Sequence, residues 1–252
     1  MKNTSKNNIK KAQSFVTILG IKINSTRKEE LLNAIREKLS QKIHFYIVTP
    51  NPEIVLQAQN EPKLTHSLNS ADFSVPDGVG LKFAAPELQI IKGRELFLDL
   101  LKIANERKLK VYLLGGRDFV NKRAQDFVKS QYPNIIVSGS SPYVEVNSTK
   151  QFEVVKEINF FEPDLLFVAF GAPKQELWVD KFKSQMPNVK GIMVVGGTLD
   201  YFAGVVKPVP GLFANLHLEW FWRVIQEPKR IGRIFNAVII FPMKVILSKI
   251  ST

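Results

Sequence analysis

Short apolar runs that end in turn residues alternate along the chain with segments of helical periodicity. Continuous apolar runs of this length, each followed by a helix, are typical of parallel strands that are buried on both faces. We therefore predict an α/β fold with a mostly parallel sheet. The predicted strands are His44–Val48, Val111–Leu114, Leu165–Phe170, Ile192–Val195 and a weaker one at Asp72–Val75.

Amphipathic spacing predicts helices that cover both faces of this sheet. Each of two segments places four apolar residues along one face: Lys28–Leu39 with Leu31, Leu32, Ile35 and Leu39, and Leu96–Ala104 with Leu96, Leu100, Leu101 and Ala104. Further helices are predicted over Asn121–Ser130 and Gln151–Asn159, the second after a turn-rich segment at Ser138–Pro142.

A change of composition near residue 205 predicts a domain boundary. The Gly204–Gly211 segment has the proline and glycine content of a linker, and aromatic residues, arginines and a long apolar stretch follow it. The first residues are polar and lysine-rich, without the apolar stretch of a secretion signal. We predict a disordered tail over residues 1–12, an α/β domain over 13–206 and a C-terminal helical appendage over 207–252.

Composition narrows the classes of protein. With 45% hydrophobic and 23% charged residues, the chain of 252 residues is globular. The absence of cysteine excludes a disulfide scaffold and a cysteine nucleophile, and fits a cytoplasmic location. A net charge of +12 indicates an acidic partner: nucleic acid, anionic lipid or a phosphorylated substrate. The longest apolar stretch, Ile234–Ile250, is interrupted by Pro242 and Lys244, so we expect no membrane-spanning helix.

Glycines follow three of the predicted strands, at the edge where open α/β sheets bind their ligands. They are Gly115 and Gly116, Gly171, and Gly196 with Gly197. Glycine before a helix lets backbone N–H groups approach a negative ligand, so these turns predict a phosphate or diphosphate site. A sharp turn without a ligand explains any single pair equally well. The glycine patterns of dinucleotide-binding folds and P-loops are absent, which disfavours a nicotinamide oxidoreductase.

Polar residues follow the other two predicted strands. Asp77, between a proline and a glycine, is the candidate general base, because apolar surroundings can raise the pKa of a carboxylate toward neutrality. The alternative is a turn aspartate that bonds its own backbone. Thr49 and Asn51 offer a hydroxyl and an amide for sugar hydroxyls, with a helix N-cap as the alternative for each.

Pro173 is suited to the first turn of a helix, which places Gln175 and Glu176 at the same edge. Gln175 can both donate and accept, which suits uracil or a sugar hydroxyl, whereas Glu176 and Asp200 can each offset a helix dipole. For Asp200, binding of the ligand is an equal alternative to this dipole role. The three histidines lack metal spacing and no Asp-x-Asp pattern occurs, so we predict no metal and no cofactor.

Aromatic residues and arginines mix in the segment Glu219–Arg233, with Arg223, Arg230 and Arg233 as candidate binding residues. Such a segment can bind phosphates, dock on lipid headgroups or stack on nucleic-acid bases. The apolar segment Ile234–Leu247 follows it and predicts burial at an anionic lipid interface. The alternative for the aromatic segment is a helix packed on the body, and for the apolar segment a helix packed on the body or across a dimer.

Together these motifs resemble the WecG/TagA/CpsF family of bacterial glycosyltransferases, in the family's order and over roughly residues 15–233. The matching segments are Ile18–Ile21, Thr49–Glu53, Val75–Gly80, Leu113–Gly116, Phe170–Glu176, Gly196–Asp200, Leu218–Trp220 and Gln226–Arg230.

The resemblance implies transfer of a sugar from a UDP donor to a polyprenyl-diphosphate-linked sugar, in the synthesis of cell-envelope polysaccharide or teichoic acid. The sugar is N-acetylmannosamine in the best-known members, and the mechanism is inverting and independent of metal. Asp77 matches the family's proposed base, with Thr49 beside it as the second catalytic candidate. Asn51 and Gln175 match substrate-binding positions. Arg223, Arg230 and Arg233 match an appendage that closes over the diphosphate and touches the membrane.

Two segments depart from the family's pattern. Family members carry a Glu-Arg pair before the glycine that matches Gly93, whereas Gln89–Arg94 has no arginine there, so Lys92 or Arg94 is the candidate substitute. The Lys207–Pro210 segment replaces a basic Arg-Ala-Pro.

The expected partners are therefore a UDP-sugar, a polyprenyl-diphosphate-linked acceptor and an anionic membrane surface, without nucleic acid. The expected location is cytoplasmic, on the inner face of the cell membrane. The sequence does not decide whether the chain forms a homo-oligomer. The alternative function is a non-catalytic nucleotide- or nucleic-acid-binding α/β protein. A non-catalytic lectin-like relative is a further alternative.

Overall fold

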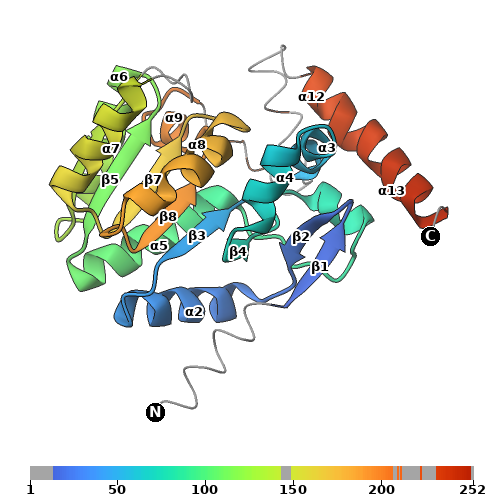
Figure 1. The fold of residues 1–252 in the computed structure, drawn as a ribbon, viewed down its shortest axis with the longest axis horizontal. Helices are drawn as coiled ribbons and strands as arrows, with labels where there is room; N and C mark the ends of the chain where they lie inside the picture. The colour runs from blue at the N-terminus through green and yellow to red at the C-terminus, as the bar shows by residue number, and fades with distance from the viewer. Residues whose placement is uncertain are drawn as a thin grey trace.

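A six-stranded parallel sheet, with the strand order β4-β3-β8-β7-β5-β6, forms the centre of the protein (Figure 1). The structure is a computed structural model that describes residues 14–142, 149–206, 209, 211, 222 and 231–250. The predicted α/β fold with a mostly parallel sheet is confirmed. The strands are β3 (Phe45–Val48), β4 (Phe73–Ser74), β5 (Lys110–Gly115), β6 (Ile136–Ser140), β7 (Leu165–Ala169) and β8 (Gly191–Val194).

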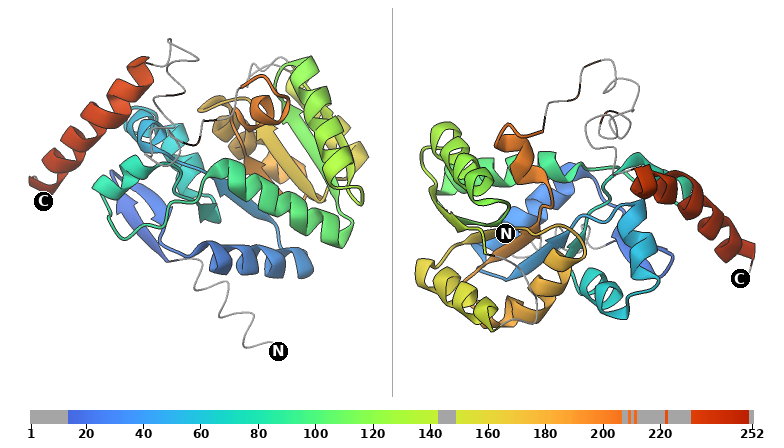
Figure 2. Two further views of the ribbon diagram at one scale, coloured as in Figure 1. Left: turned by 180° about the vertical axis from the view of Figure 1, so that it is seen from behind. Right: turned by 90° about the horizontal axis from the view of Figure 1, so that it is seen from above.

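Helices cover both faces of the sheet and bury two separate apolar clusters (Figures 1 and 2). Strand side chains point alternately to the two faces, so Phe45 and Ile47 join one cluster whereas Tyr46 and Val48 join the other. This double burial explains why the strands are continuous apolar runs. The first face carries α2 (Lys28–Ser40), α5 (Gly93–Arg107), α6 (Asp118–Gln131) and α9 (Thr198–Phe202), and the second carries α3 (Pro52–Ala58), α4 (Pro62–Asn69), α7 (Lys150–Phe161) and α8 (Lys174–Phe182).

The five predicted strands and four predicted helices are present, but the turn-rich interpretation of Ser138–Pro142 is wrong for its first half. Residues up to Ser140 belong to β6, which pairs with β5 at the edge of the sheet. Its residues are partly exposed, so it lacks the apolar run of a central strand. Gly139 fits because a Cβ atom there would lie 2.3 Å from the Leu113 carbonyl oxygen.

An antiparallel hairpin, absent from the predicted elements, precedes α2. It consists of β1 (Phe15–Ile18) and β2 (Ile21–Asn24), and its two turn residues, Leu19 and Gly20, have positive φ angles of 46° and 79°. The Asn69 side chain of α4 accepts from the Lys22 amide at 2.9 Å and donates to the Gly20 carbonyl at 2.9 Å. The hairpin is thereby fixed to the α4 side of the sheet.

The C-terminal helix lies against α3 at the side of the molecule and projects beyond it (Figures 1 and 2). It runs through α12 (Ile231–Phe235), the π-helical η4 (Asn236–Ile240) and α13 (Phe241–Ile250). Phe241 and Val245 are buried in the core. No helix among the described residues is long and apolar enough to cross a membrane. The predicted tail over residues 1–12 and most of residues 207–230 lie outside the described residues.

Candidate active site

Three predicted site residues, Thr49, Asn51 and Asp77, meet at the carboxyl ends of β3 and β4. The Val75 amide donates to the Val48 carbonyl at 2.8 Å and the Asp77 amide donates to the Pro50 carbonyl at 3.0 Å. These two bonds hold the two loops side by side. The three site residues are all half-buried, so their side chains remain within reach of a ligand.

Asn51 acts as the N-cap of α3, because its Oδ1 atom accepts from the Ile54 amide at 3.0 Å. The helix N-cap, which the sequence analysis gave as the alternative role of Asn51, is therefore present. The Asn51 amide nitrogen has no hydrogen-bond partner among the described residues, and this donor is what Asn51 can offer to a substrate. Thr49 lies against the start of α5, where a Cβ atom on Gly93 would lie 3.4 Å from its side chain. The start of α5 is therefore a direct neighbour of Thr49.

The predicted glycines after β5 lie where the chain directions diverge. β5 and β7 are neighbours, but α6 and α8, which follow them, pack on opposite faces of the sheet. Such switch points are where open α/β sheets bind ligands. Gly115 and Gly116 have φ angles of +99° and +77°, and the Gly116 amide donates to the Ala169 carbonyl at 3.1 Å. A Cβ atom on Gly115 would lie 2.7 Å from the Phe170 ring, so close packing alone requires that glycine.

The glycines after β7 and β8 differ from Gly115, because open space surrounds them. Gly171 and Gly196 have φ angles of +77° and +52°, and a Cβ atom on either would meet no atom within 4 Å. Gly197 is exposed. These backbone segments are therefore accessible, as a diphosphate site between α8 and α9 requires.

Gln175 is buried and bridges the loops after β7 and β8. Its Oε1 atom accepts from the Gly196 amide at 3.0 Å, and its Nε2 atom donates to Glu176 Oε1 at 2.9 Å. Both ends of the amide thus bind protein atoms, and direct contact of Gln175 with uracil or sugar stays a prediction. Glu176 is buried as well, and this burial raises the pKa of its carboxyl to about 7.

Two arginine side chains contact α9, the helix that follows Gly197. Arg117 lies 3.6 Å from Asp200 in an ion pair. Asp200 lies in the first turn of α9, where it can offset the helix dipole, and its ligand role stays a prediction. The Arg94 guanidinium stacks 4.2 Å above the Tyr201 ring of α9. Lys92 is the N-cap residue of α5. Both candidate substitutes for the absent family arginine therefore lie at the start of the helix that contacts Thr49.

The remaining predicted binding residues are not placed by the structure. Arg223 and Arg230 lie outside the described residues, and Arg233 belongs to α12 with its side chain outside the description. Within the described parts of the chain, no three His, Cys, Asp or Glu side chains come together as metal ligands would. The expectation of a metal-independent site stays a prediction.

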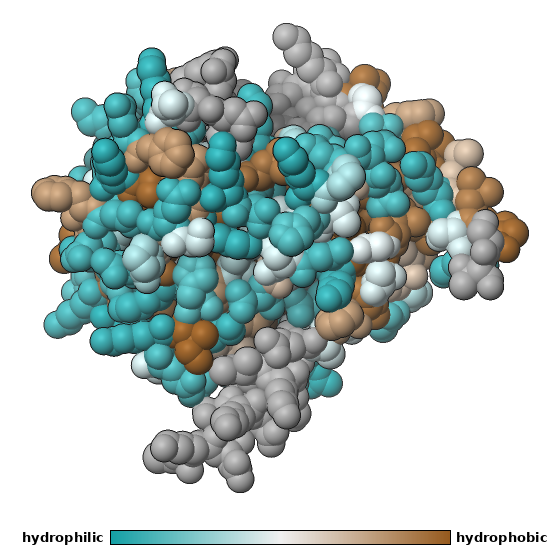
Figure 3. Space-filling view, in the orientation of Figure 1, coloured by the Kyte–Doolittle hydropathy of each residue, from teal (hydrophilic) through white to brown (hydrophobic). Residues whose placement is uncertain are grey.

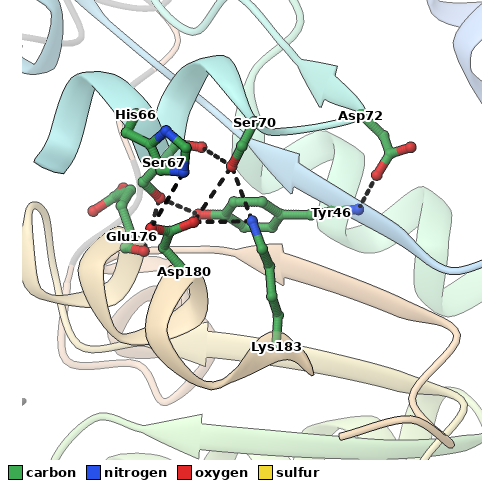
Figure 4. A network of polar contacts seen from close by, with 8 residues as sticks. All are labelled: Tyr46, His66, Ser67, Ser70, Asp72, Glu176, Asp180 and Lys183. Atoms are coloured by element: carbon green, nitrogen blue, oxygen red, sulfur yellow. Dashed lines mark hydrogen bonds and ion pairs between the residues drawn. The ribbon is translucent and has the colours of Figure 1, made fainter. Parts of the chain in front are cut away.

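A polar network anchors α8 to α4 and β3 behind these loops (Figure 4). The Ser67 hydroxyl donates to the Glu176 carbonyl at 2.8 Å and lies 3.5 Å from the Tyr46 hydroxyl. Lys183 donates to Asp180 at 2.9 Å. Burial raises the pKa of Tyr46 well above its usual value, so its hydroxyl stays protonated. The network holds the helix that presents Gln175.

Sequence reasoning missed two residues at this edge. Gly93 was noted only as a motif position, and no local sequence signal indicated that it lies beside Thr49. Glu176 was assigned to the helix dipole, yet it shares a helical face with Val179, which is buried. That spacing is the signal that could have indicated a buried carboxyl.

A parallel sheet whose switch-point loops carry open glycines, beside a carboxylate, a hydroxyl and an amide, is typical of enzymes that bind phosphate-bearing ligands. A family model described as "Glycosyl transferase WecG/TagA/CpsF family" matches residues 16–252. The chain belongs to this family and is a glycosyltransferase, so the resemblance seen in the sequence is confirmed.

The relatives with curated names point the same way. The chain is 35% identical, over 241 residues, to the N-acetylglucosaminyldiphosphoundecaprenol N-acetyl-beta-D-mannosaminyltransferase of Staphylococcus aureus strain MRSA252. The same identity holds for the protein of that name from strain MW2. Each alignment covers 93% of this chain and 93% of the relative, so the likeness extends over nearly the whole length of both.

Proposed function

We propose that the chain transfers N-acetylmannosamine from UDP to a polyprenyl-diphosphate-linked N-acetylglucosamine, with inversion and without metal. The likeness of nearly the whole chain to the mannosaminyltransferases carries this proposal. Thr49, Asn51 and Asp77 come together at one end of the sheet, which supports the proposal. The acceptor hydroxyl needs a base, and the acceptor sugar needs polar side chains close to that base.

The proposed reaction is a single displacement. Asp77 removes the proton of the acceptor hydroxyl, whose oxygen forms a bond to the anomeric carbon of the donor sugar. The bond between that carbon and the β-phosphate oxygen breaks, and UDP leaves with the electron pair. The loops at Gly171 and at Gly196–Gly197 receive the diphosphate, and backbone N–H groups stabilise its charge. The Gly196 N–H is not one of them, because it donates to Gln175. Thr49 and the amide nitrogen of Asn51 orient the acceptor.

Incubation with UDP-N-acetylmannosamine and a short-chain diphosphate-linked N-acetylglucosamine tests this function. In EDTA we expect release of UDP together with a disaccharide lipid, and no UDP when the acceptor is omitted. Failure with this and other UDP-sugars would remove the proposal. Binding of UDP without turnover would instead support the non-catalytic alternative.

The proposal includes association with an anionic membrane through the C-terminal helix. Phe235, Ile239, Met243 and Leu247 are 44–58% exposed on this helix, and hydrophobic residues gather over it at the right of Figure 3. Lys244 and Lys249, on α13, are positively charged and would be attracted to an anionic leaflet.

The η1 turn (Val79–Phe83) extends this apolar surface toward the site. Val79 and Phe83 are 49% and 50% exposed, directly after Asp77. A Cβ atom on Gly80 would lie 3.9 Å from the Ala237 carbonyl oxygen, so η1 and the C-terminal helix are neighbours. A lipid-linked acceptor held at this surface would have its diphosphate sugar close to the proposed base.

The double variant Ile239→Glu/Met243→Glu is expected to sediment with phosphatidylglycerol vesicles at least tenfold less than the wild-type chain. Full burial of each side chain contributes about 1.5–3 kcal/mol, and the new carboxylates are repelled by the lipid charge. Phe160→Glu is the matched control, because Phe160 is 92% exposed on α7. Equal sedimentation of the double variant and wild type would show that this helix does not bind the membrane.

A further inference from the structure

Gln175 and Glu176 form a buried pair in the first turn of α8, with relative exposures of 3% and 1%. The Gln175 amide joins Glu176 Oε1 to the backbone N–H of Gly196, through bonds of 2.9 and 3.0 Å. A continuous hydrogen-bonded bridge therefore runs from the Glu176 carboxyl to the loop after β8.

The direction of this bridge depends on Glu176. An amide turned over about its last torsion would present its NH₂ group to the Gly196 N–H, so that two donors would face each other. An acceptor at position 176 selects the observed orientation, because it binds the NH₂ group and leaves Oε1 toward Gly196. With an apolar side chain at that position, only the Gly196 N–H would favour the observed orientation, and the amide would be held less firmly.

A glutamate at this buried position is less favourable for stability than an apolar side chain of similar size. Its Oε2 atom is buried and has no hydrogen-bond partner among the described residues. A buried polar atom without a partner destabilises a fold, and an apolar side chain of similar size avoids that loss. The carboxyl is therefore better explained by what it holds in place than by stability.

Backbone bonds from Val195 to Val168 and from Thr198 to Val195 flank the Gly196–Gly197 loop, and the Gln175 side chain binds the loop between them. Open space surrounds Gly196, and Gly197 after it is exposed. The φ angle of Gly196 is +52°, and glycine adopts positive and negative φ angles about equally readily, so the residue itself does not fix this conformation. The amide of Gln175 restrains this otherwise permissive segment.

We propose that Glu176 is a positioning residue for the donor. It fixes the orientation of the Gln175 amide, and through it the Gly196–Gly197 loop, in the conformation that receives the diphosphate of the UDP-sugar. This inference rests on the proposed function, which assigns the donor diphosphate to the glycine loops.

Calorimetric titration with UDP tests the effect on the donor. Glu176→Leu removes the acceptor and is expected to bind UDP roughly three- to tenfold more weakly, the equivalent of one hydrogen bond. Glu176→Gln keeps an acceptor oxygen and should bind within about twofold of wild type. In turnover, Glu176→Leu should raise the donor KM more than it lowers kcat. Glu153→Leu, the same substitution at an exposed position on α7, is the control with unchanged UDP affinity.

Hydrogen exchange of the Gly196 amide, followed by NMR without ligand, tests the bridge itself. The amide should exchange faster in Glu176→Leu than in wild type, and at the wild-type rate in Glu176→Gln. Glu176→Met replaces the leucine variant if circular dichroism shows that the latter is unfolded.

Equal exchange and equal UDP affinity in wild type and Glu176→Leu would overturn the inference. Equal losses in Glu176→Leu and Glu176→Gln would also overturn it, because they would show that the carboxyl charge matters and the acceptor does not. If wild type does not bind UDP, the proposed function fails, and the donor part of the inference fails with it whatever the exchange data show.

Discussion

Replacement of Asp77 by asparagine is expected to lower kcat by about 10²–10⁴-fold, the usual contribution of a positioned general base. Asparagine keeps the shape of the side chain and the backbone bond from residue 77 to the Pro50 carbonyl, but it cannot take a proton. The donor KM should change little, because the base acts on the acceptor hydroxyl in the transition state. Steady-state kinetics with a short-chain acceptor measure both constants.

Asp126→Asn is the control for this variant, because it removes the same charge from an exposed position on α6. It should retain wild-type kinetics. A kcat of Asp77→Asn close to that of wild type would show that Asp77 is only a turn residue, the alternative that its Pro-Asp-Gly context left open.

The free energy of unfolding should carry a pH dependence that arises from Glu176. Burial raises the pKa of its carboxyl from 4.5 to about 7, so between these values the folded state holds a proton that the unfolded state has lost. The stability from this group is fully present below about pH 4.5 and is lost as the pH rises to about 7. The loss is about 3 kcal/mol by linkage, and it ends once both states are ionised.

Urea unfolding of the wild type and of Glu176→Gln between pH 5 and pH 8 measures this loss. The stability of wild type relative to the variant should fall across that range, because glutamine does not titrate. Ser67→Ala loses a hydrogen bond without a titrating group, and its difference from wild type should be the same at every pH. A constant difference between wild type and Glu176→Gln would show that the carboxyl is ionised throughout.

Local sequence determined much of the fold and the place of the site. Strands buried on both faces, such as β7, must be continuously apolar, so they stand out against amphipathic helices. Turn residues after each strand marked the carboxyl edge, and that is where Thr49, Asn51 and Asp77 lie together. The motif order identified the family, which the match over residues 16–252 confirms.

Tertiary structure decided what depends on contacts between distant segments. β6 is a strand because it pairs with β5, since its own residues have no apolar run. The strand order follows from which faces the helices cover, and local periodicity carries no such information. Gln175 points to Gly196 instead of outward because a buried acceptor at Glu176 and an amide 21 residues away meet its two ends. These outcomes are set by packing and hydrogen-bond satisfaction between elements, so the sequence alone could indicate the residues but not their partners.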